Sequence, residues 1–258
     1  MPIALVTGAT AGIGAAFVRL LSSEGYDLVL VARDEARLKS SAAGLPGEAE
    51  IISADLSTTG GCQLVEQRLA DDGRPVDLLV NNAGIGLAHS FVNNSIDDEE
   101  RLLAINVRAV MRLTHAALPG MIARGRGGVI NVSSVAGFAP MLPGHTYSAS
   151  KAWVTNFSES LYTSMRPRGV RVMALAPGFV RTEFHDSAGI DMDKLSDWQW
   201  LDADDVVRTA LADLRRWRPV STPSVAYKVL GGLARHVPRP LFRAVTGRAS
   251  KRIGRNPN

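Results

Sequence analysis

The chain alternates short, continuously apolar runs with longer stretches in which apolar residues recur at helical spacing. The apolar runs predict strands at residues 3–7, 28–32, 49–54, 77–81, 128–133 and 170–176. Runs without polar alternation are typical of strands that are buried on both faces of a parallel sheet. The stretches between them predict helices at residues 12–24, 34–43, 60–71, about 97–124, 147–166 and 202–216.

This β-α-β-α order predicts an α/β protein built on one doubly wound parallel sheet. Right-handed crossovers then place helices on both faces of the sheet, in three α/β/α layers. No internal repeat, low-complexity linker or second-domain boundary interrupts the pattern. We therefore expect residues 1–258 to form a single domain.

The pattern becomes less regular after Trp217, and we define residues 217–258 as a basic C-terminal extension. The stretch 218–223 (RPVSTP) predicts a last edge strand, 225–237 shows helical spacing, and 241–245 predicts one more short helix. An amphipathic basic helix of this kind can touch an anionic membrane surface. Packing against the body of the protein or against a second subunit is the favoured interpretation.

Charge is distributed unevenly between the two ends of the chain. Residues 1–206 carry 17 Lys and Arg against 24 Asp and Glu, a net charge of −7. Residues 207–258 carry 12 Lys and Arg against one Asp, a net charge of +11, so the whole chain has a net charge of +4. A basic final fifth can meet an anionic substrate, a nucleic acid or an acidic membrane surface. The alternative is a solvated face that aids solubility.

Composition and cysteine content bear on the compartment. The chain is 46% hydrophobic and 21% charged, which is ordinary for a soluble globular protein with a good core. Its start lacks the basic segment and the long apolar segment of a signal peptide, and no apolar stretch is long enough to cross a bilayer. Cys62 is the single cysteine, so no intrachain disulfide is expected. These features predict a reduced, cytoplasmic setting.

A glycine-rich turn, TGATAGIG (residues 7–14), lies directly between the first strand and the first helix. Gly8 permits a sharp turn, Gly12 lets a pyrophosphate approach the backbone, and Gly14 lets the helix and strand pack closely. The helix N-terminus then offers free N–H groups and a positive dipole end to phosphates. This context predicts a dinucleotide site rather than an ordinary strand-to-helix connection.

Candidate acid–base chemistry lies in HTYSASKAWVTNF (residues 145–157). Tyr147 and Lys151 are one helical turn apart and share a helix face. A free phenol has a pKa near 10, and an ammonium group beside it favours the phenolate and lowers that pKa. Ser134 ends the fifth strand, at the sheet edge where ligands bind, and its hydroxyl can donate to a substrate carbonyl. The histidines show no metal-ligand spacing and no G-x-S-x-G occurs, so neither a metal site nor a serine nucleophile is predicted.

Together these motifs resemble the short-chain dehydrogenase/reductase family. The turn matches its TGxxxGxG cofactor loop, and NNAG (Asn81–Gly84) matches its sheet-stabilising motif. The remaining matches are Asn106, Ser134, Tyr147 and Lys151 for the catalytic Asn, Ser and YxxxK, and Pro177, Gly178 and Thr182 for PGxxxT. They run in the correct order from residue 3 to about residue 183. The resemblance implies a Rossmann-type sheet of about seven strands in the order 3-2-1-4-5-6-7.

The resemblance also implies a nicotinamide dinucleotide site. Its cofactor contacts are carried over to Gly8, Thr10, Ala11, Gly12, Ile13, Gly14, Arg33, Asp55, Leu56, Asn82, Ala83, Gly84, Tyr147, Lys151, Pro177, Gly178, Val180 and Thr182. Arg33 occupies the discriminating position after the second strand, which favours NADP(H) over NAD(H) because a guanidinium accommodates a 2′-phosphate. Asp34 suits the N-cap of the next helix, although it can also repel the phosphate or bind ribose. Asp55 resembles the adenine-contacting Asp of the family, or it caps a turn.

The implied reaction interconverts a carbonyl and a secondary alcohol. Tyr147 is expected to act as general acid and base, and Lys151 to lower the pKa of Tyr147 and bind the ribose. Ser134 is expected to stabilise the carbonyl oxygen, and Asn106 to hold a water for a proton relay. Thr182 is expected to bind the nicotinamide carboxamide.

The substrate end is predicted from the aromatic residues around these positions. Residues 178–201 are expected to form a lid with Phe184 and Trp198, Phe138 is expected on the opposite wall, and Ser134 and Tyr147 are expected to contact the substrate. This favours a hydrophobic carbonyl or alcohol.

Two alternatives to that substrate assignment stay open, and a third is less favoured. One is a reductase of a 3-oxoacyl thioester or of a lipid with an anionic handle, and another is a non-catalytic NADP(H)-binding regulator. A nucleic-acid partner for the basic tail is the least favoured. The resemblance implies a homodimer or homotetramer paired through helices 97–124 and 147–166.

Overall fold

A seven-stranded parallel sheet in the order β3-β2-β1-β4-β5-β6-β9 forms the centre of the protein. The computed structural model describes residues 1–138, 145–182 and 199–236. The strands are β1 (Ile3–Thr7), β2 (Asp27–Ala32), β3 (Ala49–Ser53), β4 (Leu78–Asn81), β5 (Gly127–Val132), β6 (Val170–Leu175) and β9 (Val220–Ser221). The predicted doubly wound sheet is therefore confirmed, with β9 as its seventh strand and as the predicted edge strand.

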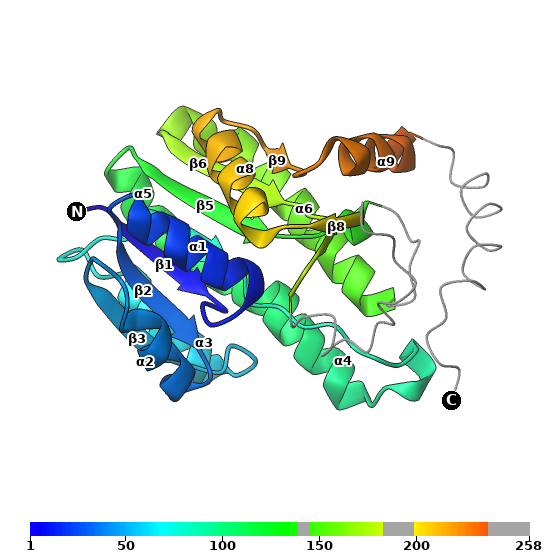
Figure 1. Cartoon of the computed structure of the whole chain (residues 1–258), viewed down its shortest axis with the longest axis horizontal. Coiled ribbons are helices and arrows are strands. Elements are labelled where there is room, and N and C mark those ends of the chain that lie inside the picture. The colour runs from blue at the N-terminus through cyan, green and yellow to red at the C-terminus, as the bar shows by residue number, and fades with distance from the viewer. Residues whose placement is uncertain (139–144, 183–198, 237–258) are drawn as a thin grey trace.

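Helices cover both faces of this sheet, in the predicted three layers (Figure 1). One face carries α1 (Gly12–Ser23), α2 (Glu35–Ala42) and α8 (Ala203–Arg215), and the other carries α3 (Thr59–Leu69), α5 (Val110–Ala123) and α6 (His145–Met165). Two further helices, α4 (Ile96–Leu103) and α9 (Val225–His236), lie near the carboxyl ends of the strands in Figure 1.

Two hydrophobic cores explain why the strand sequences are continuously apolar. In β1, Ala4 and Val6 belong to the core under α1 and α8, whereas Ile3 and Leu5 belong to the core under α3 and α5. All four side chains are buried. Successive side chains of a strand point to opposite faces, so a sheet covered on both sides needs an apolar residue at every position.

The helix predicted at about 97–124 is in fact three segments. After α4 ends at Leu103, residues Ala104–Ala109 form a π-helix, and α5 begins at Val110. Short π-helical segments insert an extra residue into a helix and are frequent at functional sites. The π-helical segment of this protein contains Asn106.

A small second sheet was not predicted. Strands β7 (Phe179–Val180) and β8 (Trp200–Leu201) pair in parallel, with Phe179 opposite Trp200. They join the two ends of the predicted lid at 178–201, whose interior, including Phe184 and Trp198, lies outside the described residues. Only two residue pairs join these strands, so we expect contacts with neighbouring side chains to help fix their position.

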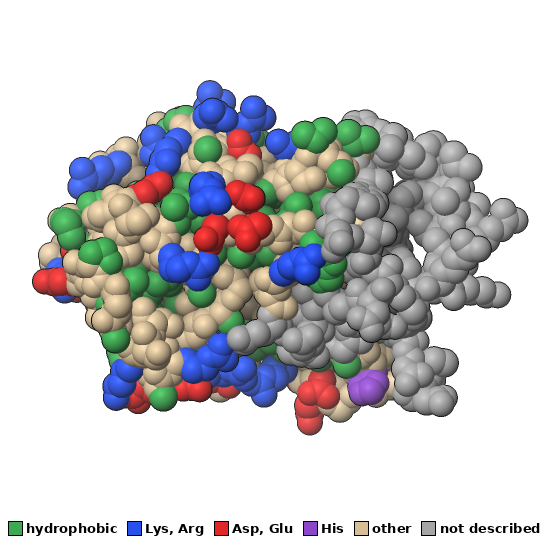
Figure 2. Space-filling view, in the orientation of Figure 1, with side chains coloured by type: hydrophobic (Ala, Val, Ile, Leu, Met, Phe, Trp, Pro, Cys, Tyr) green, Lys and Arg blue, Asp and Glu red, His purple; other side chains and the backbone are tan. Residues whose placement is uncertain are grey.

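The C-terminal extension is described as far as His236. Helix α9 confirms the helical spacing that begins at Val225, and the short helix predicted at 241–245 lies outside the described residues. Within the described ranges, no helix combines the length and apolar character needed to cross a membrane. Figure 2 shows acidic and basic side chains interspersed on the face formed by α1 and α8, where Arg19 pairs with Asp204.

Candidate active site

A cavity of about 820 Å³ lies at the carboxyl ends of the parallel strands. Ligands of doubly wound sheets bind at this edge, where the strand order reverses. Most predicted cofactor and catalytic residues line the cavity, namely Gly8, Thr10, Ala11, Gly12, Ile13, Arg33, Asp55, Leu56, Asn82, Ala83, Gly84, Ser134, Tyr147, Lys151, Pro177, Gly178, Val180 and Thr182. Gly14 and Asn106 are the predicted cofactor and catalytic residues that do not line it.

The glycine turn has the geometry that its sequence predicts. Gly8 and Gly12 have φ angles of 65° and 53°, in the left-handed region that favours glycine. A β-carbon on Gly14 would lie 2.0 Å from the Gly8 carbonyl oxygen, so only glycine permits this approach of α1 to the turn. Ala11, the N-cap of α1, makes no side-chain cap, and the first turn of the helix is therefore open to an anion.

The NNAG motif anchors this turn to the neighbouring strand. Asn82 Nδ2 donates to the Thr7 carbonyl oxygen at 2.9 Å, and the Asn82 and Ala83 amides both donate to Thr7 Oγ1 at 3.0 Å. Asn81 Nδ2 donates to Thr114 Oγ1 and to Asn131 Oδ1, at 3.1 and 2.9 Å, inside the buried layer. The motif therefore stabilises the sheet edge, as the sequence implies.

Basic side chains lie where the second strand ends. Arg33 is exposed and lines the cavity. Its carbonyl oxygen accepts a hydrogen bond from the Ser53 hydroxyl at 3.0 Å, whereas its guanidinium group makes no hydrogen bond or ion pair with the described residues. Asp34 Oδ1 accepts a hydrogen bond from the Arg37 amide at 3.0 Å, which confirms its predicted role as the N-cap of α2. Arg37 lines the cavity as well, and its Nη2 donates to the Thr10 carbonyl oxygen at 3.3 Å. Sequence reasoning missed Arg37, although its place in the first turn of α2, behind the cap, could have indicated it.

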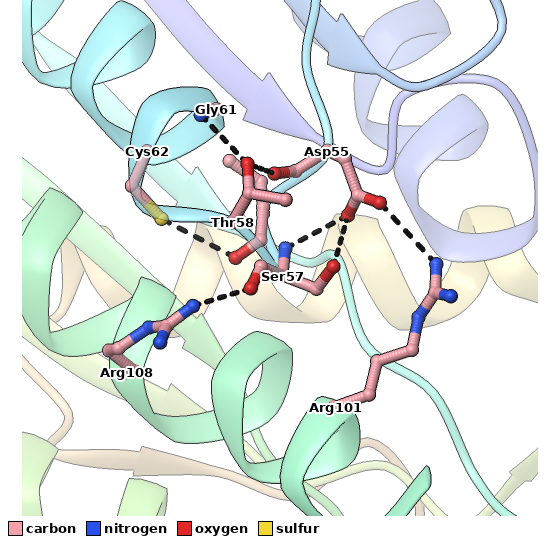
Figure 3. Close-up of polar contacts among 8 residues, drawn as sticks. Asp55, Ser57, Thr58, Gly61, Cys62, Arg101 and Arg108 are labelled. Carbon is pink, nitrogen blue, oxygen red and sulfur yellow. Dashed lines mark hydrogen bonds and ion pairs between the residues drawn. The ribbon is translucent and has the colours of Figure 1, made fainter. Parts of the chain in front are cut away.

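Asp55 shapes the turn after β3 (Figure 3). Its Oδ1 accepts hydrogen bonds from the Ser57 amide at 2.9 Å and the Ser57 hydroxyl at 2.7 Å, and its Oδ2 lies 3.5 Å from Arg101 Nη2. Burial acts to raise the pKa of Asp55, but these bonds and the charges of Arg101 and Arg33 lower it overall. The predicted turn cap is confirmed, and the ionised carboxyl group also faces the cavity.

The same turn is held from two further sides, as Figure 3 shows. Arg108, in the π-helical segment, donates to the Ser57 carbonyl oxygen. Cys62 Sγ donates to the Leu56 carbonyl oxygen at 3.4 Å, and burial raises the pKa of the Cys62 thiol. A buried thiol with a raised pKa is a packing residue rather than a reactive one.

Ser134, Tyr147 and Lys151 meet at the other end of the cavity. Tyr147 and Lys151 share one face of α6, with Lys151 Nζ at 5.7 Å from the centre of the Tyr147 ring. The Tyr147 hydroxyl is hydrogen-bonded to the Ser134 side chain. The adjacent Ser133 hydroxyl instead contacts the Lys151 carbonyl oxygen and Thr155 Oγ1, both at 2.7 Å, so it faces away from Tyr147. The structure thus brings together the three groups that the sequence predicts.

The electrostatics of this group correct one expectation. Lys151 was expected to lower the pKa of Tyr147, but burial raises the pKa of Tyr147 to about 12, even though the hydrogen bond with Ser134 acts in the opposite direction. Burial also lowers the pKa of Lys151 to about 8. Loss of water favours the neutral form of each group, and the Lys151 ammonium donates to the Val132 carbonyl oxygen at 2.9 Å instead of to the phenol. The side chains of the site therefore keep the phenol protonated at neutral pH.

Asn106 is fully buried beneath this group. Its Oδ1 accepts from the Ile85 amide and its Nδ2 donates to the Ile85 carbonyl oxygen, both at 2.9 Å. Nδ2 also lies 3.3 Å from Ser150 Oγ. A β-carbon on Gly84 would lie 3.2 Å from Asn106 Oδ1 and 3.4 Å from Lys151 Nζ, so both side chains pack closely against the Gly84 backbone. The amide of Asn106 holds the loop after β4, and its part in a proton relay stays a prediction.

Apolar residues that sequence reasoning missed also line the cavity. These are Ile85, Ile105, Val135, Ala136 and Phe179. Ile85, Val135 and Ala136 lie three or four residues after the ends of β4 and β5, and that position was the available signal. Phe138 lies against Gly231 of α9, and its predicted contact with substrate stays a prediction, as do those of Phe184 and Trp198 outside the described residues.

Comparison with known proteins agrees with this geometry. The family model of the short chain dehydrogenases matches residues 2–193. A short-chain dehydrogenase from Sphingobium yanoikuyae, solved in complex with NADPH, is 36% identical, with a TM-score of 0.84 over 90% of this chain and 93% of that one. A bulky-bulky ketone specific alcohol dehydrogenase from Comamonas testosteroni is 30% identical, with a TM-score of 0.78 over 98% and 94% of the two chains.

A curated relative adds a named activity. The NADP-dependent 3-hydroxy acid dehydrogenase of Escherichia coli is 35% identical over 184 residues, which cover 70% of this chain and 74% of that protein. The family match covers most of the chain, and the fold and the predicted motifs agree with it. The protein therefore belongs to the short-chain dehydrogenase/reductase family of oxidoreductases.

Proposed function

We propose that the protein is an NADP(H)-dependent oxidoreductase that interconverts a carbonyl and a secondary alcohol on a hydrophobic substrate. The observation that carries the proposal is the meeting of Ser134, Tyr147 and Lys151 in the cavity that also contains the glycine turn. A protein that only sensed the cofactor would have no need of a hydroxyl pair set up for proton transfer.

The residues along the cavity suit a phosphorylated dinucleotide. The open first turn of α1 and the backbone at Gly8 and Gly12 provide for a pyrophosphate. Arg33, with its unpaired guanidinium group among the described residues, provides for a 2′-phosphate, and Arg37 lies beside it on the same cavity wall. The NADP dependence named for the Escherichia coli relative and the NADPH bound to the Sphingobium protein support the same cofactor here.

The chain's own residues would bind the carbonyl and move the proton. When bound, NADPH supplies the hydride. The Ser134 hydroxyl donates to the carbonyl oxygen, where negative charge develops, and the Tyr147 phenol transfers its proton to that oxygen to complete the alcohol. The phenolate that remains is stabilised by the Lys151 ammonium on the same helix face, and a proton from solvent restores the phenol. Oxidation uses the same groups in reverse.

The cavity wall favours an apolar substrate. Val135, Ala136, Ile85 and Phe179 are all apolar and line the same cavity as Tyr147. The Comamonas relative is named for bulky ketones, which is consistent with that wall. The second candidate is a 3-oxoacyl or 3-hydroxy acid substrate with an anionic handle, which is favoured by the +11 charge of residues 207–258 and by the name of the Escherichia coli relative.

The direct test follows NADPH and NADH absorbance with a panel of bulky ketones, aldehydes and 3-oxoacyl thioesters. We expect turnover of a bulky ketone with NADPH, and loss of turnover but not of NADPH binding in Tyr147→Phe. Preferred turnover of the thioesters would support the second candidate. Tight NADPH binding without turnover of any compound would instead support the regulator, and near-normal turnover by Tyr147→Phe would reject the assigned acid.

A homodimer or homotetramer remains part of the proposal. Leu103, at the end of α4, and Met111, near the start of α5, are each 44% exposed. Contiguous patches of exposed apolar side chains mark interaction sites. Light scattering coupled to size-exclusion chromatography tests the assembly. A single monomer peak at micromolar concentration would reject it.

A further inference from the structure

Helix α9 faces the active-site loops with two residues that are one helical turn apart. Tyr227 is buried, with 6% of its surface exposed, whereas Val225 and Val229 on the outer side are 76% and 57% exposed. Gly231 follows Tyr227 by four residues and is buried too. Residues i and i+4 share a helix face, so Tyr227 and Gly231 form one contact surface. Figure 1 shows α9 beyond the end of β9, on the side of the molecule where α6 begins.

The Tyr227 ring occupies the space over Gly178. A β-carbon on Gly178 would lie 2.1 Å from Tyr227 Cε2 and 2.2 Å from Cζ, so only a glycine fits beneath this ring. The Tyr227 hydroxyl accepts a hydrogen bond from the Phe179 amide at 3.4 Å and donates one to the Gln199 carbonyl oxygen at 2.8 Å. It therefore bridges Phe179, which begins β7, and Gln199, which precedes β8.

The segment held by Tyr227 forms part of the cavity. Gly178, Phe179 and Thr182 all line it, and the Thr182 methyl group lies 2.9 Å from the position that a β-carbon on Gly12 would take. A change in the position of residues 178–182 therefore reaches the phosphate-binding turn. The contact between α9 and Gly178 acts on the cofactor end of the wall.

Gly231 of α9 contacts the loop after β5, and in this contact the glycine belongs to α9 and the aromatic ring to the loop. A β-carbon on Gly231 would lie 2.7 and 2.8 Å from Cδ2 and Cε2 of Phe138, so the Phe138 ring packs directly on the helix backbone. Phe138 ends the 3₁₀ turn (Val135–Gly137) that follows Ser134, and its amide donates to the Val135 carbonyl oxygen at 3.0 Å. The Val135 amide in turn donates to the Pro177 carbonyl oxygen at 3.1 Å, which joins the two loops.

We propose that α9 is a positioning element of the active site, in which Tyr227 fixes the Gly178–Thr182 segment and Gly231 fixes the turn that carries Ser134. In each contact, an aromatic ring of one element fills the space left by a glycine of the other. The two contacts set the separation of the loops that flank Tyr147. This inference rests on the proposed function, because it assigns the two loops to the cofactor and to the carbonyl.

Two substitutions separate the contacts, and the chain offers a matched control for each. Tyr227→Phe keeps the ring over Gly178 and removes only the bridging hydroxyl, and Tyr162→Phe, on the far part of α6, is its control. Gly231→Ala inserts a methyl group against Phe138. Gly232→Ala is the control in the same helix, because a β-carbon there meets no atom of the described part of the chain within 4 Å. Gly231→Ala and Gly232→Ala bring the same gain in helix propensity, so the difference between the two variants reports the contact with Phe138.

Three measurements are made on the full-length variants: NADPH affinity by fluorescence titration, kcat and KM for the best ketone, and hydrogen exchange of peptides covering 134–138 and 178–182. Tyr227→Phe should weaken NADPH binding about threefold to tenfold and speed exchange at 178–182, as expected for the loss of one bridging hydroxyl. Gly231→Ala should lower kcat/KM for the ketone about tenfold or more, with NADPH affinity within about twofold of wild type, because its contact reaches Ser134 rather than the cofactor segment. Both controls should match the wild type.

The inference is overturned if Tyr227→Phe and Gly231→Ala melt at lower temperature but keep wild-type NADPH affinity, kcat/KM and loop exchange, which is the result of a purely structural helix. Equal losses in Gly231→Ala and Gly232→Ala would overturn it as well. Absence of ketone turnover by the wild type would reject the proposed function alone, since the exchange and NADPH measurements would still decide the role of α9.

Discussion

Lys151 should destabilise the fold at neutral pH, and its replacement by methionine tests the electrostatics of the site. Lys151 is 5% exposed, and burial lowers its pKa from 10.5 to about 8. Below pH 8 the ammonium is charged in both the folded and the unfolded chain, so the cost of burying the charge is present in full. This lowering of the Lys151 pKa corresponds to about 3.4 kcal/mol, as an order of magnitude.

The sign of the pH dependence follows from proton binding. Between pH 8 and 10.5 the unfolded chain binds more protons at this lysine than the folded chain does, so the lysine's destabilising effect fades as pH rises. Methionine removes the charge, but it also removes the hydrogen bond from Nζ to the Val132 carbonyl oxygen, which is worth about 1 kcal/mol. Lys151→Met should therefore stabilise the protein by about 2 kcal/mol at pH 7, equivalent to a rise in Tm of about 4–8 °C for a chain of this size.

Urea unfolding of the wild type and Lys151→Met at pH 7 and pH 10.5, without added nucleotide, measures the effect. The advantage of Lys151→Met should disappear by pH 10.5, and its reductase activity should be lost at every pH. Lys39→Met is the control, because Lys39 is an exposed lysine paired with Glu35 on α2 and should show no comparable change. A variant that is less stable than wild type at pH 7, or a difference in stability that does not vary with pH, would refute the reasoning.

Three further predictions concern the cofactor end and the buried amide. Arg33→Ala should raise KM for NADPH about tenfold or more and leave KM for NADH unchanged in steady-state assays. The reason is that a charge-assisted contact to a phosphate is worth about 1.5–3 kcal/mol and Arg33 is exposed. Equal losses with both cofactors would contradict a 2′-phosphate contact. Gly14→Ala should destabilise the fold by roughly 1–3 kcal/mol in urea unfolding, because its β-carbon would lie 2.0 Å from the Gly8 carbonyl oxygen; an unchanged midpoint would show that the turn and α1 separate freely. Asn106→Ala leaves the Ile85 amide and carbonyl groups without their partner and should cost about 2–4 kcal/mol in thermal or urea unfolding. If Asn106 also supports a proton relay, kcat should fall while NADPH affinity is kept, and loss of stability with unchanged kcat would limit this residue to a structural role.

The amino-acid sequence by itself determined the layers of the fold and most of the cofactor wall. Continuously apolar runs mark strands covered on both faces, and the carboxyl ends of parallel strands meet at one edge, so Gly8 and Ser134 could be predicted to gather there. The resemblance to the family added Asn82 and Pro177, which line the same cavity. Spacing placed Tyr147 and Lys151 on one helix face, since the geometry of a helix brings i and i+4 together, and the glycine turn, Ser134 and the family resemblance indicated their role.

Only the tertiary structure decided the features that depend on contacts between distant segments. The π-helical segment at Ala104–Ala109 has no distinct signal in a helical sequence pattern, and the pairing of β7 with β8 joins residues about twenty positions apart. The pKa of Tyr147 was misjudged from sequence because spacing reveals the neighbouring charge but not the loss of water, which is the larger effect here. The contacts of Tyr227 with Gly178 and of Phe138 with Gly231 likewise arise from packing across the fold, where the shape of one segment is completed by another.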